Sequence, residues 1–387
     1  MSPRQSRAME ALPGYPMAGL KERRLELEAR GVDVIDLGAG DADLTPPPAV
    51  VAAIQKAVEE PSMSRYPFQV GLPAFRKKIS WWMEKRFGVS VDPNVEVLPL
   101  IGSKEGLAHL PFAFLNAGDV GIMPDPGYQA YRGGTVLAGG EPWMVPLRPE
   151  HDFLIPLADI PADVVKRSRI LYLNYPNNPT AASAPDSYYR DAIAFCREHD
   201  VILVHDHAYS EIAFDGYKPP SILQFEGARD VAIEFHSLSK TYNMTGWRLA
   251  WAAGNKSLVG ALNRVKTFMD TGAFLGVQAA GVAALDCWET WVPGNVAVFQ
   301  RRRDRAVAAM RKAGFEVVSP QATIYLWIPV PGGGPSRDFQ RRCLDQEGVI
   351  VLGGSGLGDG GEGFFRIALT VPEERLEEAA MRLGRVV

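Results

Sequence analysis

The sequence predicts an α/β fold in which a mostly parallel β-sheet lies between helices. From about residue 48 to residue 285, short apolar runs rich in β-branched residues alternate with amphipathic helical runs. This alternation is typical of parallel strands joined by crossover helices. Several apolar runs also end in clusters of polar residues. Ligands bind beyond the carboxyl ends of parallel strands, so these clusters predict one site at one edge of the sheet.

Each expected element follows from local patterning. Near the N-terminus we expect a charged helix at Leu20 to Arg30 and a short strand at Val32 to Leu37. The strands expected in the sheet are Val95 to Ile101, Val120 to Met123, Arg169 to Leu173, Val201 to His205, Val231 to His236 and Leu249 to Ala253. The helices expected between and after them are Ala162 to Lys166, Asp186 to Glu198 and a long arginine-rich helix from near Asn295 to Lys312.

The remainder of the chain, residues 315 to 387, alternates strand and helix with glycine-rich turns. We therefore expect a small domain that is assembled from both chain ends. The predicted boundaries are an N-terminal arm with part of the small domain at 1–47, a large domain at 48–285 and the rest of the small domain at 286–387.

Composition limits the classes of function. The 387 residues are 47% hydrophobic and 22% charged, as in ordinary soluble globular proteins, and the net charge of −4 argues against nucleic acid and acidic membranes as partners. Cys196, Cys287 and Cys343 lie far apart without metal-ligand spacing, which indicates buried thiols in a reducing compartment. Neither a signal peptide nor a membrane span is evident, and a cytoplasmic protein is expected.

The most informative stretch follows the expected strand Val231 to His236. There Ser237, Ser239 and Lys240 are followed by Arg248. Hydroxyls and a guanidinium are suitable donors for a phosphate. An amine beside a bound phosphate suggests a lysine joined by a Schiff base to pyridoxal phosphate. A surface lysine beside a structural arginine would be the plain alternative if this stretch stood alone.

The other strand ends add polar and aromatic groups. Ser103 and Lys104 stand at the start of a helical pattern, where free amides attract phosphate. Tyr128 could stack on a ring, and Asn178 lies in a proline-rich loop that presents amide donors. Each of these signals is weak by itself, because helix caps, rim tyrosines and asparagine turns are common structural features.

Asp206 ends the apolar run Val201 to His205 and precedes Tyr209. A buried carboxylate needs a cation or hydrogen bonds. A protonated pyridine nitrogen is such a cation, although a salt bridge or a helix cap would also serve. His205 and His207 could suggest a metal, but no third ligand has suitable spacing, so we expect none.

One motif suggests a different function. Gly356, Gly358 and Gly361 match the dinucleotide-binding fingerprint after an apolar run. However, no crossover helix pattern follows, and 26 residues remain for the rest of such a unit. We therefore reject an oxidoreductase.

Taken in order, these segments resemble a class I/II aminotransferase of pyridoxal-phosphate fold type I, and the resemblance covers nearly the whole chain. Bacterial aspartate aminotransferases and LL-diaminopimelate aminotransferases are the most similar kinds. The matching stretches are Gly38 to Asp43, Arg65-Tyr66, Gly71 to Pro73, Gly102 to Lys104, Asn177 to Thr180, Asp206 to Tyr209, Ser237 to Arg248 and Phe364 to Arg366. The resemblance implies a seven-stranded large-domain sheet, a small α/β domain and a homodimer with shared active sites.

The resemblance also implies roles. Lys240 would hold the cofactor covalently and then carry the proton between substrate and cofactor carbons. Asp206 would pair with the pyridine nitrogen, Tyr209 and Asn178 would bond the ring hydroxyl oxygen, and Tyr128 would stack on the ring. The phosphate would be surrounded by Ser103, Lys104 through its backbone, Ser237, Ser239, Arg248 and, from the neighbouring subunit, Tyr66. Substrate contacts would come from Gly40, Tyr15, Lys104, Asn178 and Arg366, the last clamping the α-carboxylate.

The expected reaction moves an α-amino group between an amino acid and a 2-oxo acid by a ping-pong mechanism through pyridoxamine phosphate. Lys104 favours an acidic donor such as aspartate or glutamate. LL-diaminopimelate enzymes resemble one another in having a glutamate where Gln69 stands, and an asparagine expected in the stretch Phe274 to Gln278 is missing here. An LL-diaminopimelate, alanine or broad-specificity aminotransferase is the alternative. A β-eliminating C–S lyase uses the same lysine, and a ligand-sensing regulator would need a DNA-binding segment for which there is no room before Gly38.

Overall fold

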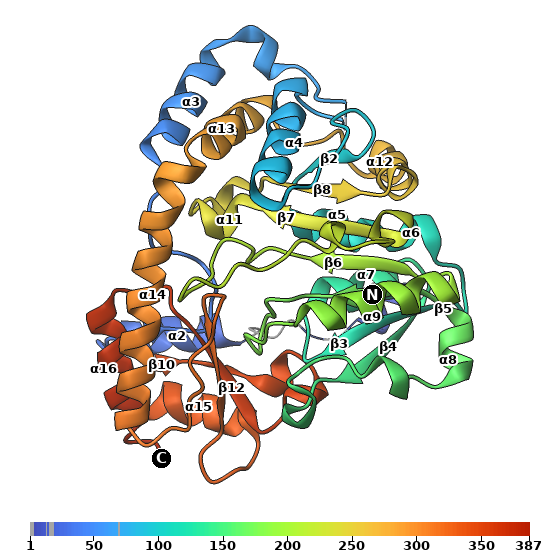
Figure 1. Cartoon of the computed structure of the whole chain (residues 1–387). Coiled ribbons are helices and arrows are strands. Elements are labelled where there is room, and N and C mark those ends of the chain that lie inside the picture. Colours follow the sequence, from blue (N-terminus) through green and yellow to red (C-terminus); the bar gives the residue numbers. More distant parts are fainter. Residues whose placement is uncertain (1–3, 13, 15–18, 69) are drawn as a thin grey trace.

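The central sheet lies between two layers of helices. The computed structural model describes residues 4–12, 14, 19–68 and 70–387. Within them the sheet has seven strands in the order β2-β8-β7-β6-β5-β3-β4 (Figure 1). These are β2 (Val97–Leu100), β3 (Val120–Asp125), β4 (Glu141–Pro146), β5 (Ser168–Leu173), β6 (Ile202–Asp206), β7 (Ala232–Ser237) and β8 (Ala250–Gly254). β8 runs antiparallel to both of its neighbours, and the other pairs are parallel. The predicted fold class is confirmed.

Helices from both ends and the middle of the chain cover the sheets. They are α1 (Arg7–Glu10), α2 (Leu20–Ala29), α3 (Pro48–Glu59), α4 (Pro73–Phe87), α5 (Ser103–His109), α6 (Pro111–Phe114), α7 (Gln129–Leu137), α8 (Ala162–Arg167), α9 (Asp186–His199), α10 (Ala228–Val231), α11 (Leu238–Thr241), α12 (Lys256–Met269), α13 (Leu275–Asp286), α14 (Trp288–Lys312), α15 (Ser336–Glu347) and α16 (Glu373–Leu383). In the part of the chain that the structure describes, no helix is long and apolar enough to cross a membrane.

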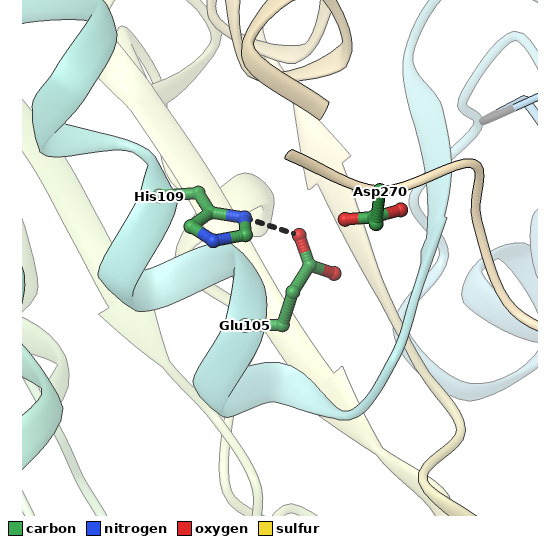
Figure 2. Close-up of side chains that lie close together, drawn as sticks. All are labelled: Glu105, His109 and Asp270. Carbon is green, nitrogen blue, oxygen red and sulfur yellow. Dashed lines mark hydrogen bonds and ion pairs between the residues drawn. The ribbon is translucent and has the colours of Figure 1, made fainter. Parts of the chain in front are cut away.

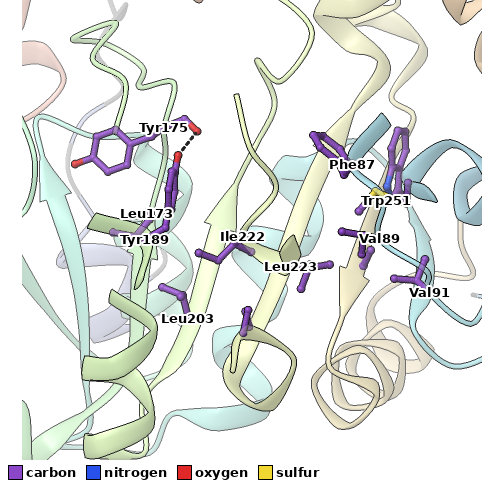
Figure 3. Close-up of a cluster of buried hydrophobic side chains, with 14 of the residues drawn as sticks. Phe87, Val89, Val91, Leu173, Tyr175, Tyr189, Leu203, Ile222, Leu223 and Trp251 are labelled. Carbon is purple, nitrogen blue, oxygen red and sulfur yellow. Dashed lines mark hydrogen bonds between the residues drawn. The ribbon is translucent and has the colours of Figure 1, made fainter. Parts of the chain in front are cut away.

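The strands of the central sheet are apolar on both faces because both faces are covered. Along β5, Leu171 and Leu173 belong to one core cluster, whereas Ile170 and Tyr172 belong to another. Successive side chains of a strand point to opposite faces. The first cluster includes side chains of α4, α9 and α13 and is shown in Figure 3, and the second includes side chains of α5, α7 and α12. Continuous apolar runs are therefore what this sheet requires.

A smaller body holds its own core and joins both chain ends. Its strands are β1 (Ile35–Asp36), β9 (Tyr325–Pro329), β10 (Val349–Ile350), β11 (Leu352–Gly353) and β12 (Phe364–Ala368). β1 pairs in parallel with β10, and β12 lies between β11 and β9 in an antiparallel sheet. This pairing brings the residues around Gly40 beside the C-terminal part of the chain. The predicted domain boundaries, 1–47, 48–285 and 286–387, remain our proposal.

Helix α14 connects the two bodies (Figure 1). Val292, near its start, belongs to a core cluster of the central sheet, and Phe299 and Met310 belong to the core of the smaller body. The helix begins at Trp288, earlier than the predicted start near Asn295, and contains Pro293 in its first turns. Pro293 is the sixth residue of the helix, inside it, so its missing N–H removes one hydrogen bond of the helix to the Glu289 carbonyl.

Candidate active site

A cavity of about 380 Å³ lies beyond the carboxyl ends of the central strands, against the smaller body. It is lined by most of the predicted site residues, namely Gly40, Ser103, Lys104, Tyr128, Asn178, Asp206, Tyr209, Ser237, Ser239, Lys240, Arg248 and Arg366. Ser103, Tyr128, Asn178, Asp206 and Ser237 follow or end β2, β3, β5, β6 and β7. These residues lie together because the strands that precede them end at a common edge of the sheet, as the sequence pattern predicted.

One end of the cavity is suited to an anion. Ser103 begins α5, and Ser237 ends β7 with its Oγ accepting a hydrogen bond from the Ser239 amide at 3.1 Å. Arg248 has a left-handed backbone (φ 53°), and its Nη1 donates to the Thr245 carbonyl at 2.8 Å. A Cβ on Gly102 would lie 2.2 Å from Arg248 Nη2, so glycine there leaves space for the guanidinium. Hydroxyls, helix-start amides and a guanidinium together are suited to bind a phosphate.

Lys104 extends from this end along the wall. Its ammonium lies 5.9 Å from the centroid of the Tyr128 ring. Burial, together with the nearby Arg248 charge, lowers the pKa of Lys104. Lys104 therefore lines the cavity, with part of its side chain open to solvent.

The floor of the cavity carries a carboxylate with one free oxygen. Asp206, at the end of β6, is 5% exposed. Its Oδ2 accepts a hydrogen bond from Tyr131 Oη at 2.7 Å, whereas its Oδ1 is buried and has no hydrogen-bond partner among the described residues. Burial raises the pKa of this carboxyl to about 6, although the Tyr131 hydrogen bond opposes the change. An unpaired buried carboxylate oxygen calls for a cationic N–H donor, and a protonated pyridine is one.

Lys240 stands on α11 at the junction of the two bodies. Its Nζ donates a hydrogen bond to the Gly40 carbonyl. Burial lowers the pKa of Lys240, and the Arg366 and Arg248 charges act in the same direction, while Tyr325 and Asp41 oppose it. A buried amine with a lowered pKa can be neutral and nucleophilic near neutral pH.

Arg366 on β12 is held from two sides and is 5% exposed. Its Nη1 donates to Asn178 Oδ1 and its Nη2 to the Gly38 carbonyl, both at 2.7 Å. Asn178 is itself held by Asn174, whose Oδ1 accepts the Asn178 amide at 2.8 Å. A guanidinium fixed in this way can present its planar donors to a carboxylate.

The remaining sequence predictions concern residues that do not line this cavity or that fall outside the described residues. Tyr66 is 69% exposed and does not line this cavity within its own chain. Tyr15 and Gln69 lie outside the described residues. Gln278 is fully buried, with its Oε1 accepting the Leu72 amide and its Nε2 donating to the Ala273 carbonyl, both at 2.7 Å. The amide at the end of the stretch Phe274 to Gln278 is therefore occupied in holding two backbone segments.

Tyr131 and Tyr325 were missed by the sequence reasoning. Tyr131 stands three residues after Tyr128, so one helical turn places both near the ring position, and this spacing was a usable signal. Tyr325 lies in an apolar strand of the smaller body, and nothing in its local pattern distinguishes it from a core aromatic residue.

Two other clusters of titratable residues lie nearby. Figure 2 shows Glu105, His109 and Asp270, whose ligand atoms lie within 4.8 Å of one another. Lys266 Nζ fills this cluster, 2.9 Å from Glu105 Oε2 and 3.0 Å from Asp270 Oδ1, so a lysine ammonium provides its positive charge. Among the strands, His205 contacts Glu234 Oε2 through Nδ1 and the Tyr175 carbonyl through Nε2. Both histidine nitrogens have protein partners.

The glycines of the rejected dinucleotide motif serve packing. A Cβ on Gly358 would lie 1.8 Å from Asp125 Oδ1. Two short 3₁₀ turns, at Gly354–Gly356 and Asp359–Gly361, replace the helix that a dinucleotide fold requires.

The donor set of the cavity fits pyridoxal phosphate. Donors suited to a phosphate, a free carboxylate oxygen on the floor, an aromatic residue and a buried amine line one cavity, as a phosphorylated pyridine aldehyde requires. The geometry defines the class of protein as a fold type I pyridoxal-phosphate enzyme.

Comparison with known proteins gives the family. The model of the aminotransferase class I and II family matches residues 32–383, and the chain belongs to this family. It is 47% identical over 386 residues to the LL-diaminopimelate aminotransferase of Desulforudis audaxviator, with 99% of this chain and 98% of the relative covered. Identity to the LL-diaminopimelate aminotransferase of Aquifex aeolicus is 49% over 375 residues, covering 97% of each chain. The substrate-bound BacF structure from Bacillus subtilis superimposes with a TM-score of 0.95 at 34% identity, covering 100% of this chain and 98% of that one.

The protein is therefore an aminotransferase that uses pyridoxal phosphate. The cofactor and the enzyme class predicted from the sequence are confirmed.

Proposed function

We propose that this enzyme transfers an α-amino group from LL-diaminopimelate to a 2-oxo acid. The observation that carries the proposal is the similarity to LL-diaminopimelate aminotransferases, at 47% and 49% identity over nearly the full length of each chain. The proposed reaction belongs to amino-acid biosynthesis.

The charges of the cavity are compatible with this substrate. LL-diaminopimelate has an amino-acid group at each end, so the end that does not react carries both an ammonium and a carboxylate. Lys104 and Asp41 line the cavity and carry opposite charges. A cation and an anion on the cavity wall can pair with the carboxylate and the ammonium of the distal end. Alanine has no charged group in its side chain and cannot form these pairs.

The residues of the cavity would share the work as follows. Pyridoxal phosphate, when bound, supplies a conjugated electron sink for the electron pair of the broken substrate Cα–H bond. Arg366 would hold the α-carboxylate by two parallel hydrogen bonds and so fix which bond faces Lys240. Lys240 Nζ would accept the Cα proton as a neutral amine and return it at the cofactor carbon, which its lowered pKa favours.

The remaining residues would hold the cofactor. Asp206 Oδ1 would keep the pyridine nitrogen protonated, and Tyr128 would stack on the ring. Tyr209 and Asn178 would bond the ring hydroxyl oxygen. The phosphate would be bound by Ser103, the Lys104 amide, Ser237, Ser239 and Arg248.

We also propose a cytoplasmic homodimer with shared active sites. Tyr66 and Phe68 are 69% and 67% exposed, and Phe268, on α12, is 85% exposed. Large exposed aromatics of this kind are typical of protein interfaces. A second copy covering Tyr66 would bring its hydroxyl to the partner's phosphate. Cysteines that are free and largely buried suit a reducing compartment.

Acidic donors remain the second candidate because Lys104 places a cation beside Tyr128. To separate the two, kcat/KM is measured with LL-diaminopimelate, aspartate, glutamate and alanine, with 2-oxoglutarate as acceptor. We expect LL-diaminopimelate to be the best donor. A higher value for aspartate or glutamate would replace the first proposal by the second.

A variant and a product assay sharpen this experiment. Lys104→Met should lower kcat/KM for LL-diaminopimelate about tenfold relative to alanine, since one charge-assisted hydrogen bond is lost. Lys312→Met, at an exposed lysine at the end of α14, is the matched control. With an amino acid that carries a thioether on Cβ as the donor, measuring both 2-oxo acid and ammonia separates transamination from β-elimination, because only elimination breaks the Cβ–S bond and releases ammonia.

A further inference from the structure

Tyr325 lies where the two bodies meet, in contact with three groups of the active site. It begins β9 opposite Ala368 of β12 and is 4% exposed. Its hydroxyl accepts a hydrogen bond from Tyr209 Oη at 3.2 Å. Its ring lies under Arg366, whose guanidinium carbon is 4.1 Å from the ring centroid.

Gly40 brings the Tyr325 hydroxyl and Lys240 together. A Cβ on Gly40 would lie 2.1 Å from Tyr325 Oη, so the hydroxyl rests directly against the glycine Cα. Lys240 Nζ donates to the carbonyl of the same glycine. The amine of Lys240 and the hydroxyl of Tyr325 therefore both lie against Gly40 and interact electrostatically, and any side chain at position 40 would displace the hydroxyl.

The charges around Tyr325 are mainly positive. The titratable groups that face it are Arg366 from β12, Lys240 from α11 and Tyr209 from the segment after β6. Burial alone would raise the pKa of Tyr325, but Arg366, Lys240 and the Tyr209 hydrogen bond outweigh it, and the pKa is lowered. Burial and Tyr325 raise the pKa of Tyr209. Of these two hydroxyls, Tyr325 is the better hydrogen-bond acceptor.

We propose that Tyr325 is a positioning residue with two separable roles: its ring orients Arg366 toward the substrate carboxylate, and its hydroxyl oxygen stabilises Lys240 as an ammonium after proton uptake. The proposal rests on the proposed function, since it concerns the same amine and the same carboxylate. No proton passes to Tyr325. The proton taken from the substrate Cα stays on Lys240 Nζ, and the hydroxyl oxygen accepts a hydrogen bond from that ammonium until the proton is returned.

Two variants separate the two roles. Tyr325→Phe retains the ring and removes the hydroxyl, so kcat should fall about tenfold or more, the loss expected for a hydrogen bond to a charged group, with KM little changed. Tyr325→Leu also removes the ring and should raise KM for the amino donor a further ~3- to 10-fold through loss of the cation–π contact. Tyr188→Phe is the control, because this buried tyrosine donates to the Ile155 carbonyl and does not line the cavity.

A titration without cofactor provides an independent readout. Ultraviolet difference spectra of the cofactor-free protein should show one tyrosine ionising below the ordinary pKa of about 10. That step should be absent from Tyr325→Phe and present in Tyr188→Phe. Because this measurement needs no turnover, it remains informative even if the protein proves not to transaminate LL-diaminopimelate.

Each result supports or overturns one role. A Tyr325→Phe enzyme with wild-type kcat and an unchanged titration overturns the role of the hydroxyl. A Tyr325→Leu enzyme with the KM of Tyr325→Phe overturns the role of the ring. If Tyr325→Leu does not fold, as judged by circular dichroism, Tyr325→Met replaces it, because methionine fills similar volume without a ring.

Discussion

The two halves of the cavity are built differently. The half that fits the cofactor consists of residues at the ends of neighbouring strands of one sheet, such as Ser103, Asp206 and Ser237. The half that faces the substrate combines Gly40, Tyr325 and Arg366, which come from distant parts of the chain. Arg366 donates to the carbonyl of Gly38, 328 residues away. One half follows from sheet topology, whereas the other depends on how the smaller body is placed.

This difference suggests that one half of the cavity holds the cofactor for the reaction and the other half selects the substrate. Strand ends in a packed sheet are rigid, so they can hold a cofactor that every reaction cycle needs. Contacts between the two bodies can be altered by amino-acid substitutions or by movement of one body relative to the other. They can therefore determine which amino acid is bound. We therefore expect changes in the cofactor half to lower turnover and changes in the substrate half to alter apparent affinity, except at the Tyr325 hydroxyl, whose proposed action is on Lys240 and therefore on turnover.

The strongest test of the cofactor half is Lys240→Ala. Removing the amine removes the group that we propose accepts and returns the proton, so turnover should fall about 10⁴-fold. Cofactor binding should persist through Asp206 and Arg248 and can be measured by equilibrium dialysis. Near wild-type turnover in this variant would remove Lys240 from the mechanism.

A second test concerns the outer support of the cofactor half. Lys266 is fully buried and binds Glu105, on α5, and Asp270. Lys266→Met leaves these two carboxylates without their shared cation, so the free energy of unfolding should fall by about 3–5 kcal/mol. Lys78→Met removes a surface pair with Asp286, whose side chain is 55% exposed, and should cost at most about 1 kcal/mol. Equal losses in urea denaturation would contradict the importance of this buried cluster.

The third test is Arg366→Lys in the substrate half. Lysine retains the charge but cannot form two parallel hydrogen bonds to a carboxylate, so KM for the amino donor should rise about 100-fold. The control is Arg305→Lys, at an arginine whose side chain is 49% exposed and which pairs with Glu373. If kcat of Arg366→Lys falls instead while KM stays constant, Arg366 does not act mainly on substrate affinity, and the proposed difference between the two halves is wrong.

The smallest expected effect is the pH dependence of cofactor binding. Burial raises the pKa of Asp206 in the cofactor-free protein to about 6, above about 3.9 in an unfolded chain. The folded protein therefore binds this proton more tightly, and stability due to Asp206 is greatest at low pH and is lost as the pH rises through 6. A pyridinium pairs with the ionised carboxylate, so cofactor affinity should fall about tenfold from pH 7 to pH 5.

Asp206→Asn is the control for this measurement. It cannot ionise, so its affinity should be lower at pH 7 and should lack the carboxylate step. The second ionisation of the cofactor phosphate, also near pH 6, affects both proteins equally. Identical pH profiles for the two proteins would show that Asp206 is not the group responsible.

The sequence predicted the cofactor half better than the substrate half. The strand expected at Val201 to His205 is β6, Ile202–Asp206, and its terminal carboxylate lies on the cavity floor. The apolar runs and their polar ends are local, so they can be read without knowing the fold. Tyr325 could not be recognised because its function depends on contacts with Gly40 and Arg366, which local patterning does not reveal.

Two elements were missed or misplaced for local reasons. β4, Glu141–Pro146, contains two prolines and alternates exposed with less exposed residues, as an edge strand does. It was therefore not among the expected strands. The start of α14 was placed too late because Pro293 interrupts the helical pattern after Trp288. Prolines are tolerated in β4 because it is the edge strand of the sheet, whereas Pro293 lies inside α14.

Helix α14 has a consequence for how the protein unfolds. Its 25 residues form one rod of roughly 37 Å, with one end in a core of the central sheet and the other in the core of the smaller body. Asn295 on this rod also donates to the Thr241 carbonyl at 3.1 Å, one residue beyond Lys240. If one core unfolds, its end of α14 loses the side-chain contacts that hold it. The other end of the same helix, which packs in the second core, is then destabilised. We therefore expect both bodies to melt in a single cooperative transition.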